Sequence, residues 1–548
     1  MSLKPSLIEP VPSETIRVAR AAFPKGNLYL SMRDELGVLF EDADFATLYP
    51  RRGQPAFAPW RLALITVMQF LDNLSDRQAA EAVRSRIDWK YALGLDLTDS
   101  GFNYSVLSGF RQRLVASDEQ SLMFDRLIEL LRDRKLLKER GKQRTDSTHV
   151  LASIRVMNRL EVVVETMRAA LNKLAIPAAV WLRSIALPEW QIRYSIRAEQ
   201  NRLPLGEKAR AEYGEKIGRD GIYLLKLIES EQPSLLDLEM IETLRRVWEV
   251  HYTRDADGAV SWRSNNQLPK AATITESPYD TEARHSNKRG LTWTGYKVHL
   301  TETCDDQLPR LITDVQTTVA TVQDVSCTAL VEESLNRKNL LPSRHLVDAG
   351  YVDAELLVTS RRRYGIELFG PTRSNVSWQA RSGGFDAAMF KVDWNRRTVV
   401  CPEGQSSNYW HEYQTKDRYA RQVTKVRFKR ADCRDCLSRT KCVNSKTGAA
   451  RQLLLPTGEF HQALEKTRIL LSSQEGRDQY RQRAGIEGTL SQAVRRGTLR
   501  RSRYRGLPKT HFQTTITAAG INVLRTINFL TDQPIAKTRI SRFARLMN

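Results

Sequence analysis

The chain has 548 residues, which is too long for one ordinary core and favours two to four domains. Hydrophobic residues make up 41% and charged residues 27%, as is usual for a folded soluble protein. The net charge of +22 favours a polyanionic partner, because neutralising phosphates releases condensed counterions. An anionic membrane surface is the rival partner, but neither terminus shows a strongly amphipathic basic helix.

Signals for export and membrane insertion are missing from the sequence. The first residues, MSLKPSLIEPVPSE, lack the pattern of a signal peptide, and the apolar run at 62–68 is short enough to be a core helix. Four of the six cysteines lie between 401 and 442, which is too sparse and clustered for a secreted disulfide scaffold. We therefore expect a cytoplasmic, nucleoid-associated protein of a bacterium with no membrane partner.

Apolar residues recur at helical spacing between 59 and 137. Within this region, 74–96 predicts a helix capped by Ser75 and Gln78, and 102–114 predicts a second short helix that carries Arg111 and Arg113. Two short basic helices joined by a turn indicate a helix-turn-helix unit on DNA. The alternative is a helical packing domain whose arginines are merely solvated.

The segment 144–154 predicts a buried strand led by Asp146. An aspartate at the start of a strand is more often a turn or cap residue than a catalyst. Helical periodicity then returns over 155–250, which indicates a helical insertion between strands of another domain.

From about residue 273 the pattern changes to strands and helices in alternation. We predict strands at 295–301, 309–320, 343–351 and 366–372, and helices at 324–339, with Asp324 as its N-cap, and 352–365. This order indicates a mixed α/β sheet. It places Asp348 at the C-terminal end of a buried strand, where open α/β sheets carry their sites.

A polar, turn-rich stretch at 373–455 interrupts this pattern and contains four thiols. Two cysteines in a CxxC turn can present two sulfurs to one tetrahedral Zn²⁺, and His411 is a spare ligand. The candidate zinc ligands are Cys401, Cys433, Cys436 and Cys442. Free thiols are the alternative, and an iron–sulfur cluster is the least favoured reading. Cys304 and Cys327 lie inside strand and helix patterns and are expected in the core.

The segment 472–496 reads as one helix, with Ser472 and Glu475 as a capping box. Tyr480, Arg483 and Glu487 fall on one face of that helix. The ordinary alternative is a solvated amphipathic helix with an intrahelical ion pair.

Residues 488–531 contain no acidic residue, and such a run of positive charge beside a candidate catalytic glutamate suits a phosphate backbone. Solvated surface is again the alternative, and the segment 512–530 predicts a closing amphipathic helix. The expected DNA contacts here are Tyr480, Arg483, Arg495, Arg496, Arg500, Arg501, Arg503, Arg505 and Lys509.

Three acids, Asp146, Asp348 and Glu487, now stand on elements that can converge. Cleavage of a phosphodiester by water or a 3′-hydroxyl is served by two hard cations, and Mg²⁺ prefers oxygen ligands. The acids are therefore candidate ligands for two Mg²⁺ ions, or for Mn²⁺ in their place. No GxxxxGK[ST] loop is present, so nothing indicates nucleotide-driven work.

Several motifs in a fixed order resemble DDE transposases of bacterial insertion sequences, most closely the insertion-sequence eleven-eighty-two group. They are LSDRQAAEAVRSRIDWKYALGLD, FNYSVLSGFRQRL, TDSTHV, SPYDTEARHSNKR with WTGYKVHLTETC, LVDAGY, CPEG with CRDC, YRQRAGIEGTLSQAVRRG and RYRGLPKTHFQTTITAAGINVLR. The resemblance implies an RNase H-like core with Asp146, Asp348 and Glu487 as catalytic residues. The family's late-helix signature of Tyr, Arg, Glu and Lys matches at Tyr480, Arg483 and Glu487, but Val494 stands where it has lysine, with Arg495 and Arg496 next to it.

The resemblance further implies binding of terminal inverted repeats, cleavage of 3′ ends and strand transfer into target DNA by a homodimer or higher oligomer. Two alternatives remain: a DNA-binding protein with an inactive RNase H-like core, and a structure-specific nuclease without strand transfer.

The expected fold class is α/β: an RNase H-like mixed sheet with flanking helices, an all-α N-terminal domain, a helical insertion and a small Cys-rich zinc-type insertion. The expected divisions are 1–140 (N-terminal, DNA-binding), 141–155 (first core strand), 156–270 (helical insertion), 271–372 (core), 373–455 (Cys-rich insertion) and 456–548 (catalytic helix and basic C-terminal segment).

Overall fold

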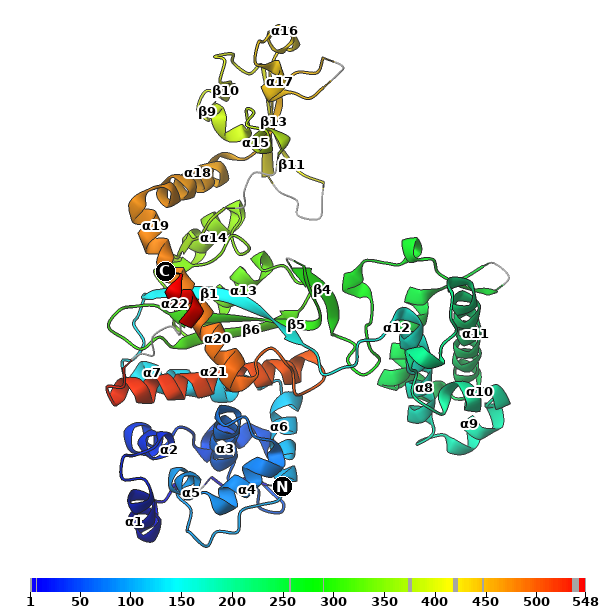
Figure 1. Cartoon of the computed structure of the whole chain (residues 1–548), viewed down its shortest axis with the longest axis vertical. Helices are drawn as coiled ribbons and strands as arrows, with labels where there is room; N and C mark the ends of the chain where they lie inside the picture. Colours follow the sequence, from blue (N-terminus) through cyan, green and yellow to red (C-terminus); the bar gives the residue numbers. More distant parts are fainter. Residues whose placement is uncertain are drawn as a thin grey trace.

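A mixed β-sheet lies at the centre of the computed structural model, which describes residues 2–5, 7–255, 258–288, 290–372, 377–416, 422–445, 448–534 and 542–547. Around this sheet, Figure 1 shows helices of the N-terminal part below, a helical lobe to the right and a small β-module at the top. The central strands are β1 (Lys142–Leu151), β4 (Arg284–Lys288), β5 (Leu291–Thr303), β6 (Ile312–Val319), β7 (Arg344–Leu346) and β8 (Glu367–Phe369).

The sheet is antiparallel on one side and parallel on the other. The order is β4-β5-β1-β7-β8, and β6 also pairs with β5. Strand β5 is antiparallel to β1, β4 and β6, whereas β7 runs parallel to β1 and β8 parallel to β7. Parallel neighbours need crossover connections, which α13 (Val325–Arg337) and α14 (Ala354–Tyr364) accompany here. The predicted mixed α/β class is therefore confirmed.

One predicted cap in this region is wrong in its chemistry. Asp324 does precede α13, but its side chain caps no backbone N–H of the helix. Its carboxylate instead pairs with Lys297 at 2.8 Å and with Lys288 at 3.3 Å. Two ammonium groups on the neighbouring strands are stronger partners than a backbone amide.

The long helix α21 (Leu507–Leu530) lies between the sheet and the N-terminal helices (Figure 1). It starts before the predicted 512–530 and is buried around most of its circumference, so it is not amphipathic as predicted. Asn522 is buried within it, and its side-chain amide accepts from the Ile312 N–H at 2.8 Å and donates to the Ile312 carbonyl at 2.7 Å. Because both groups of its amide are hydrogen-bonded, the Asn522 side chain can be buried against β6 without an unpaired polar atom.

The N-terminal part is all-helical and shares one hydrophobic core with α21 and the sheet. The Ser75 hydroxyl and the Gln78 side chain form the predicted capping box. The predicted single helix breaks at Arg86, whose backbone is extended. The helices of the N-terminal part are α1 (Ser13–Ala22), α2 (Leu28–Ser31), α3 (Pro59–Leu71), α4 (Asp76–Ser85), α5 (Ile87–Leu93), α6 (Ser105–Ala116) and α7 (Leu122–Asp133).

The helical lobe has a hydrophobic core of its own. Gly214, Gly218 and Gly221 lie on one side of the longest helix of the lobe and let aromatic rings approach its backbone. A Cβ at Gly218 would overlap the Tyr252 ring, and a Cβ at Gly221 would overlap the Trp248 ring. The Trp248 indole donates to the Gly218 carbonyl at 3.0 Å. The lobe consists of α8 (Arg159–Leu174), α9 (Ala179–Ile185), α10 (Pro188–Tyr194), α11 (Glu207–Glu231), α12 (Glu239–His251), β2 (Tyr252–Arg254) and β3 (Val260–Trp262).

The small β-module contains the four clustered cysteines and its own apolar core. A three-stranded antiparallel sheet in the order β11-β12-β13 and a hairpin of β9 and β10 form it. Its elements are α15 (Trp378–Arg381), β9 (Lys391–Asp393), β10 (Thr398–Val400), β11 (Tyr409–Gln414), β12 (Gln422–Arg427), α16 (Arg430–Arg434), α17 (Arg439–Cys442) and β13 (Gln452–Pro456).

The chain returns to the central sheet through a broken helix. After α18 (Gly458–Ser472) come α19 (Gln474–Arg481), a 3₁₀ turn over Gln482–Ala484 and α20 (Gly485–Gly497). The predicted cap at Ser472 is wrong: Ser473 is the N-cap, and its hydroxyl accepts from the Gly476 N–H at 3.0 Å. The last described helix is α22 (Arg542–Leu546), and no helix among the described residues could cross a membrane.

Candidate active site

Asp146 and Asp348 lie on adjacent parallel strands at the same level. Strand β1 pairs with β7 from Lys142 opposite Arg344 onward, and each aspartate lies four residues beyond its member of that pair. Asp146 is inside β1, whereas Asp348 follows the end of β7. The Asp146 carboxylate accepts from the Ser147 N–H at 2.8 Å, and that of Asp348 from the Gly350 N–H at 2.7 Å. These local bonds fix both carboxylates at one edge of the sheet.

Arg483 links these two aspartates to the late helices. Its Nη2 is 2.6 Å from Asp146 Oδ2 and 4.0 Å from Asp348 Oδ2. Its Nη1 is 3.6 Å from Glu487 Oε1, one helical turn further along. One guanidinium therefore contacts all three predicted catalytic carboxylates, which come from a strand, a strand end and a helix.

Glu487 is the most open of the three acids, since 68% of its side chain is exposed. In this arrangement no three His, Cys, Asp or Glu side chains of the described residues are close enough together to hold a metal ion. Arg483 places a positive charge among the carboxylates.

Burial changes the protonation of Asp146. Its loss of water raises the pKa of the carboxyl above the usual value, and the Arg483 charge opposes that rise. The neighbouring Asp348 adds to the rise, as expected for two carboxylates that share a site. The Arg483 cation favours the ionised form of Asp146.

Tyr480 faces the same edge of the sheet. Its ring packs edge-on against Phe369 at 6.2 Å between centroids and belongs to a small cluster with Leu346. Burial raises the pKa of its phenol to about 12, so the hydroxyl stays protonated at neutral pH. The signature residues Tyr480, Arg483 and Glu487 thus meet the two aspartates from one side.

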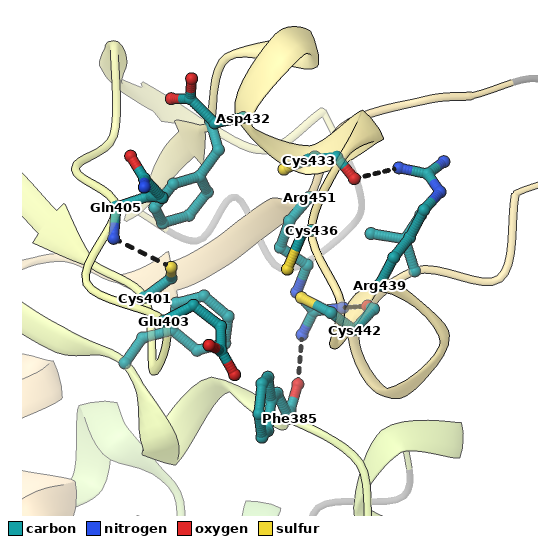
Figure 2. A pocket seen from close by; sticks show the side chains of 13 residues that line it. Phe385, Cys401, Glu403, Gln405, Asp432, Cys433, Cys436, Arg439, Cys442 and Arg451 are labelled. Atoms are coloured by element: carbon teal, nitrogen blue, oxygen red, sulfur yellow. Dashed lines mark hydrogen bonds between the residues drawn. The ribbon is translucent and has the colours of Figure 1, made fainter.

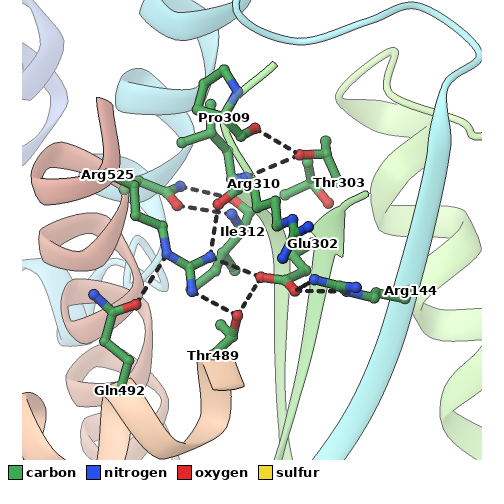
Figure 3. Close-up of polar contacts among 12 residues, drawn as sticks. Arg144, Glu302, Thr303, Pro309, Arg310, Ile312, Thr489, Gln492 and Arg525 are labelled. Atoms are coloured by element: carbon green, nitrogen blue, oxygen red, sulfur yellow. Dashed lines mark hydrogen bonds and ion pairs between the residues drawn. The ribbon is translucent and has the colours of Figure 1, made fainter. Parts of the chain in front are cut away.

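A buried ionic network holds α20 against the sheet (Figure 3). Glu302 on β5 is fully buried and pairs with Arg144 of β1 at 2.6 Å and with Arg525 of α21 at 2.8 Å. The Thr489 hydroxyl on α20 donates to the second oxygen of Glu302. Arg525 also donates to Thr489 at 2.6 Å. Two arginines and a threonine therefore compensate the charge of one buried carboxylate.

The same network determines where the late helix breaks. Arg144 donates through Nη1 to the carbonyl of Gln482, in the 3₁₀ turn directly before Arg483. A Cβ at Gly485 would lie closer than 3.0 Å to three atoms of the Arg144 guanidinium. Arg144 and Glu302 thus hold the turn and α20 on either side of Arg483 and Glu487.

Sequence reasoning missed Arg144, Glu302, Thr489 and Arg525. The available signal was charge inside strand patterns: Arg144 and Glu302 are level with each other in the β1–β5 pairing, and both sit among buried residues. A charged pair in such places is rarely left without partners. Because the predicted strand ended at residue 301, Glu302 fell outside it.

Most of the predicted DNA-contacting arginines are exposed. Arg495 and Arg496 end α20, and Arg500 donates to the Thr148 hydroxyl at 3.0 Å, beside the edge of β1. The exposed members are Arg495, Arg496, Arg500, Arg501, Arg505 and Lys509, and Arg113 is half-buried.

Arg111 and Arg503 differ from that group. Arg111 is buried, and its guanidinium pairs with Asp76 at 2.5 Å, so the expectation of a surface role for it is corrected here. Arg503 donates to the Leu74 carbonyl at 2.9 Å and to the Asn73 side chain. Both arginines connect elements of the core, and their sequence setting did not distinguish them from surface arginines.

Val494, at the position of the signature lysine, is partly buried against the main hydrophobic core. A lysine at this place would face that core, whereas Arg495 and Arg496 point into solvent. The departure from the signature therefore matches the way α20 packs.

The four clustered cysteines line one cavity of about 30 Å³ (Figure 2). Burial raises the pKa of the Cys442 thiol to about 11, with smaller contributions from the other three thiols. His411 lies on β11 and is not among the cavity residues. Cys304 and Cys327 are buried in the core, as predicted.

Two family models match the chain. Residues 400–527 match the model described as transposase DDE domain, and residues 17–113 match the one described as transposase domain (DUF772). Curated proteins and solved structures gave no match. The first match includes Arg483 and Glu487, and the second includes α4, α5 and most of α6.

Proposed function

We propose, from the two family matches, that the chain belongs with the DDE transposases of insertion sequences, and that it binds terminal inverted repeats, cleaves DNA there and transfers the strands into target DNA. Such a protein would act in the bacterial cytoplasm on nucleoid DNA, as a homodimer or higher oligomer on paired ends.

The observation that carries the proposal is the meeting of three distant acids around one cation. Asp146, Asp348 and Glu487 are separated by more than a hundred residues each, yet all contact Arg483. A concentration of negative charge at a strand edge is typical of sites for divalent cations.

The donor set fits Mg²⁺ or Mn²⁺, because it consists of hard carboxylate oxygens. Asp146, Asp348 and Glu487 would hold the ions. When bound, such ions activate a nucleophilic oxygen and stabilise the leaving oxygen of a phosphodiester.

The chain's own residues would align the DNA. Arg483 lowers the repulsion between the carboxylates and offers planar donors suited to a phosphate. Tyr480 packs on Phe369 and so fixes the start of the turn that carries Arg483. We propose the exposed basic residues after Glu487 as phosphate contacts and α4 to α6, with Arg113, as a helix-turn-helix unit.

The mixed sheet, with antiparallel strands on one side of β1 and parallel strands on the other, supports the proposed RNase H-like core. The joint cavity of Cys401, Cys433, Cys436 and Cys442 supports a structural Zn²⁺, because four sulfur ligands are a common structural zinc set. Zinc would have to draw the thiols closer and deprotonate them.

The test uses purified full-length protein and duplexes that end in the inverted repeats flanking its gene. We expect strand cleavage in Mg²⁺ but not in EDTA, and joined products when a plasmid target is added. Cleavage without joining would show a nuclease, and repeat binding without cleavage would show a protein with an inactive core. Either result would overturn the proposed function.

A further inference from the structure

The outer face of the β11–β12–β13 sheet is aromatic and basic. Residues alternate across a strand, so every second position of β11 points to the same side. Trp410 of β11, Val426 of β12 and Leu453 of β13 pair in register and pack into the apolar core of the module. The residues between them therefore form the opposite, outward face.

Three rings follow one another along this face on β11. The His411 and Tyr413 rings are 5.7 Å apart and nearly parallel, with 13° between their planes. The Tyr409 ring lies 6.2 Å from His411, on its other side. Tyr409 and His411 are exposed, and Tyr413 is half-buried. A row of aromatic rings that faces solvent buries little apolar area, so packing does not explain it.

Positive charge accompanies the rings. The register places Arg427 beside Tyr409 and Lys425 beside His411 on the neighbouring strand. The Arg427 guanidinium lies over the Tyr409 ring at 4.8 Å. On β13 the same row continues with Gln452 and with Leu454, an apolar side chain that is 57% exposed.

No acidic residue of the three strands is on this face, since Glu412, the one acid among them, alternates to the other side. Residues 385–456 as a whole contain 15 Lys and Arg against 7 Asp and Glu. A face of this charge attracts a polyanion.

The spacing of the rings decides how bases can stack on them. A base between two parallel rings needs about 6.8 Å, which is twice the ~3.4 Å rise between stacked bases in one DNA strand. The ring centroids are 5.7 and 6.2 Å apart, so bases would stack on the exposed faces of the rings and not between them.

We propose that this face binds unpaired DNA, with bases stacked on Tyr409, His411 and Tyr413 and phosphates beside Lys425 and Arg427. Unpaired rather than duplex DNA is the ligand, because rings reach base faces only where bases are unstacked. Strand cleavage at the end of a mobile element would supply such a strand. The inference rests on the proposed function in taking DNA as the nucleic acid.

The test measures fluorescence anisotropy of a labelled oligo-dT of about 16 nucleotides, a length that covers the site of one such surface, with full-length protein in EDTA. We expect Tyr409→Ala with Tyr413→Ala to weaken binding about a hundredfold, because each of the two lost stacking contacts weakens binding about tenfold. Tyr409→Phe with Tyr413→Phe keeps both rings and should bind like the unchanged protein.

Tyr223→Ala is the matched control, since Tyr223 on the helical lobe is 40% exposed and Tyr409 is 39% exposed. Lys425→Gln with Arg427→Gln should reduce the dependence of the dissociation constant on salt. Unchanged oligo-dT binding by the alanine double variant, equal loss in the phenylalanine variant, or binding of oligo-rU alone would each overturn the inference.

Because EDTA prevents cleavage, this readout is separate from the test of the proposed function. A chain that cleaves terminal repeats but shows no ring-dependent binding of oligo-dT would refute the stacking face alone. A chain that binds oligo-dT through the rings but never cleaves would refute the transposase proposal alone.

Discussion

Replacement of Gly485 by alanine tests how the late helix is held at the catalytic edge. The new methyl group would lie inside contact distance of the Arg144 guanidinium, which is itself buried between Glu302 and the carbonyl of Gln482. Arg144 has no free space to yield, because its side chain is only 3% exposed. The methyl group must therefore displace either the guanidinium or the start of α20.

The magnitude follows from two opposing effects. Glycine to alanine inside a helix usually stabilises by about 0.5–1 kcal/mol. Separating a buried carboxylate from one of its partners costs about 3–5 kcal/mol, so the net effect at Gly485 is a loss of about 2–4 kcal/mol. For a core of this size that corresponds to a fall in apparent melting temperature of about 5 °C or more.

Gly488→Ala is the matched control, because it changes the same residue type on the same helix where a Cβ meets no atom within 4 Å. Thermal unfolding of the three proteins, followed by circular dichroism, gives the comparison, and DNA cleavage rates report whether Glu487 has moved. We expect Gly488→Ala to equal or exceed the unchanged protein in stability and Gly485→Ala to fall below it. Equal melting temperatures for the two variants would refute the described role of Arg144.

Three further predictions concern the site, the pH response and the cysteines. Arg483→Ala should slow cleavage at least about a hundredfold, which is the scale of the loss when a group that stabilises charge in the transition state is removed. Arg481→Ala is the control and should cleave normally, because the Arg481 side chain is 74% exposed. Equal cleavage rates for the two variants would refute the central position of Arg483. Burial lowers the pKa of His299, His345 and His511 to about 4 each, so below pH 6.5 the unfolded chain binds protons that the folded chain does not. The melting temperature should thus be steady above pH 6.5 and fall as the pH drops towards 4, and a flat profile there would contradict neutral buried imidazoles. Metal analysis of the purified protein should find about one zinc ion per chain. The double variant Cys433→Ser with Cys436→Ser should lose this zinc, whereas the control variant Cys304→Ser should keep it. A protein without zinc, in which the four clustered thiols titrate freely, would refute the zinc proposal.

The local sequence pattern predicted the strands and helices that bring the three acids to one edge of the central sheet. Apolar residues indicated the buried strand that carries Asp146 and the short buried strand before Asp348. The capping box at Ser75 was readable for the same reason, since both of its partners lie within one helical turn. The cap of α19 was misplaced by one residue because Ser472 and Ser473 offer the same chemistry.

Long-range contacts decided what the pattern could not show. The helix predicted over 472–496 breaks at Gln482 because Arg144, more than three hundred residues earlier, bonds to its carbonyl. Arg111 has the sequence setting of a surface residue, yet Asp76 and the Tyr504 ring enclose it. The burial of Glu302 likewise depends on partners from β1, α20 and α21. Each of these contacts forms only after distant segments have packed.

Cleavage of a terminal-repeat duplex by Asp348→Ala protein in Mg²⁺ tests the central claim most directly. The Asp348 side chain is 31% exposed, accepts a hydrogen bond from the Gly350 N–H in its own turn and lies 4.0 Å from Arg483, so its loss should leave the fold and repeat binding intact. Glu475→Ala, which removes an exposed acid from α19, serves as the control for lost charge. The three-carboxylate site predicts that Asp348→Ala binds the duplex but cuts no strand, whereas Glu475→Ala cuts normally. Full cleavage by Asp348→Ala would contradict it.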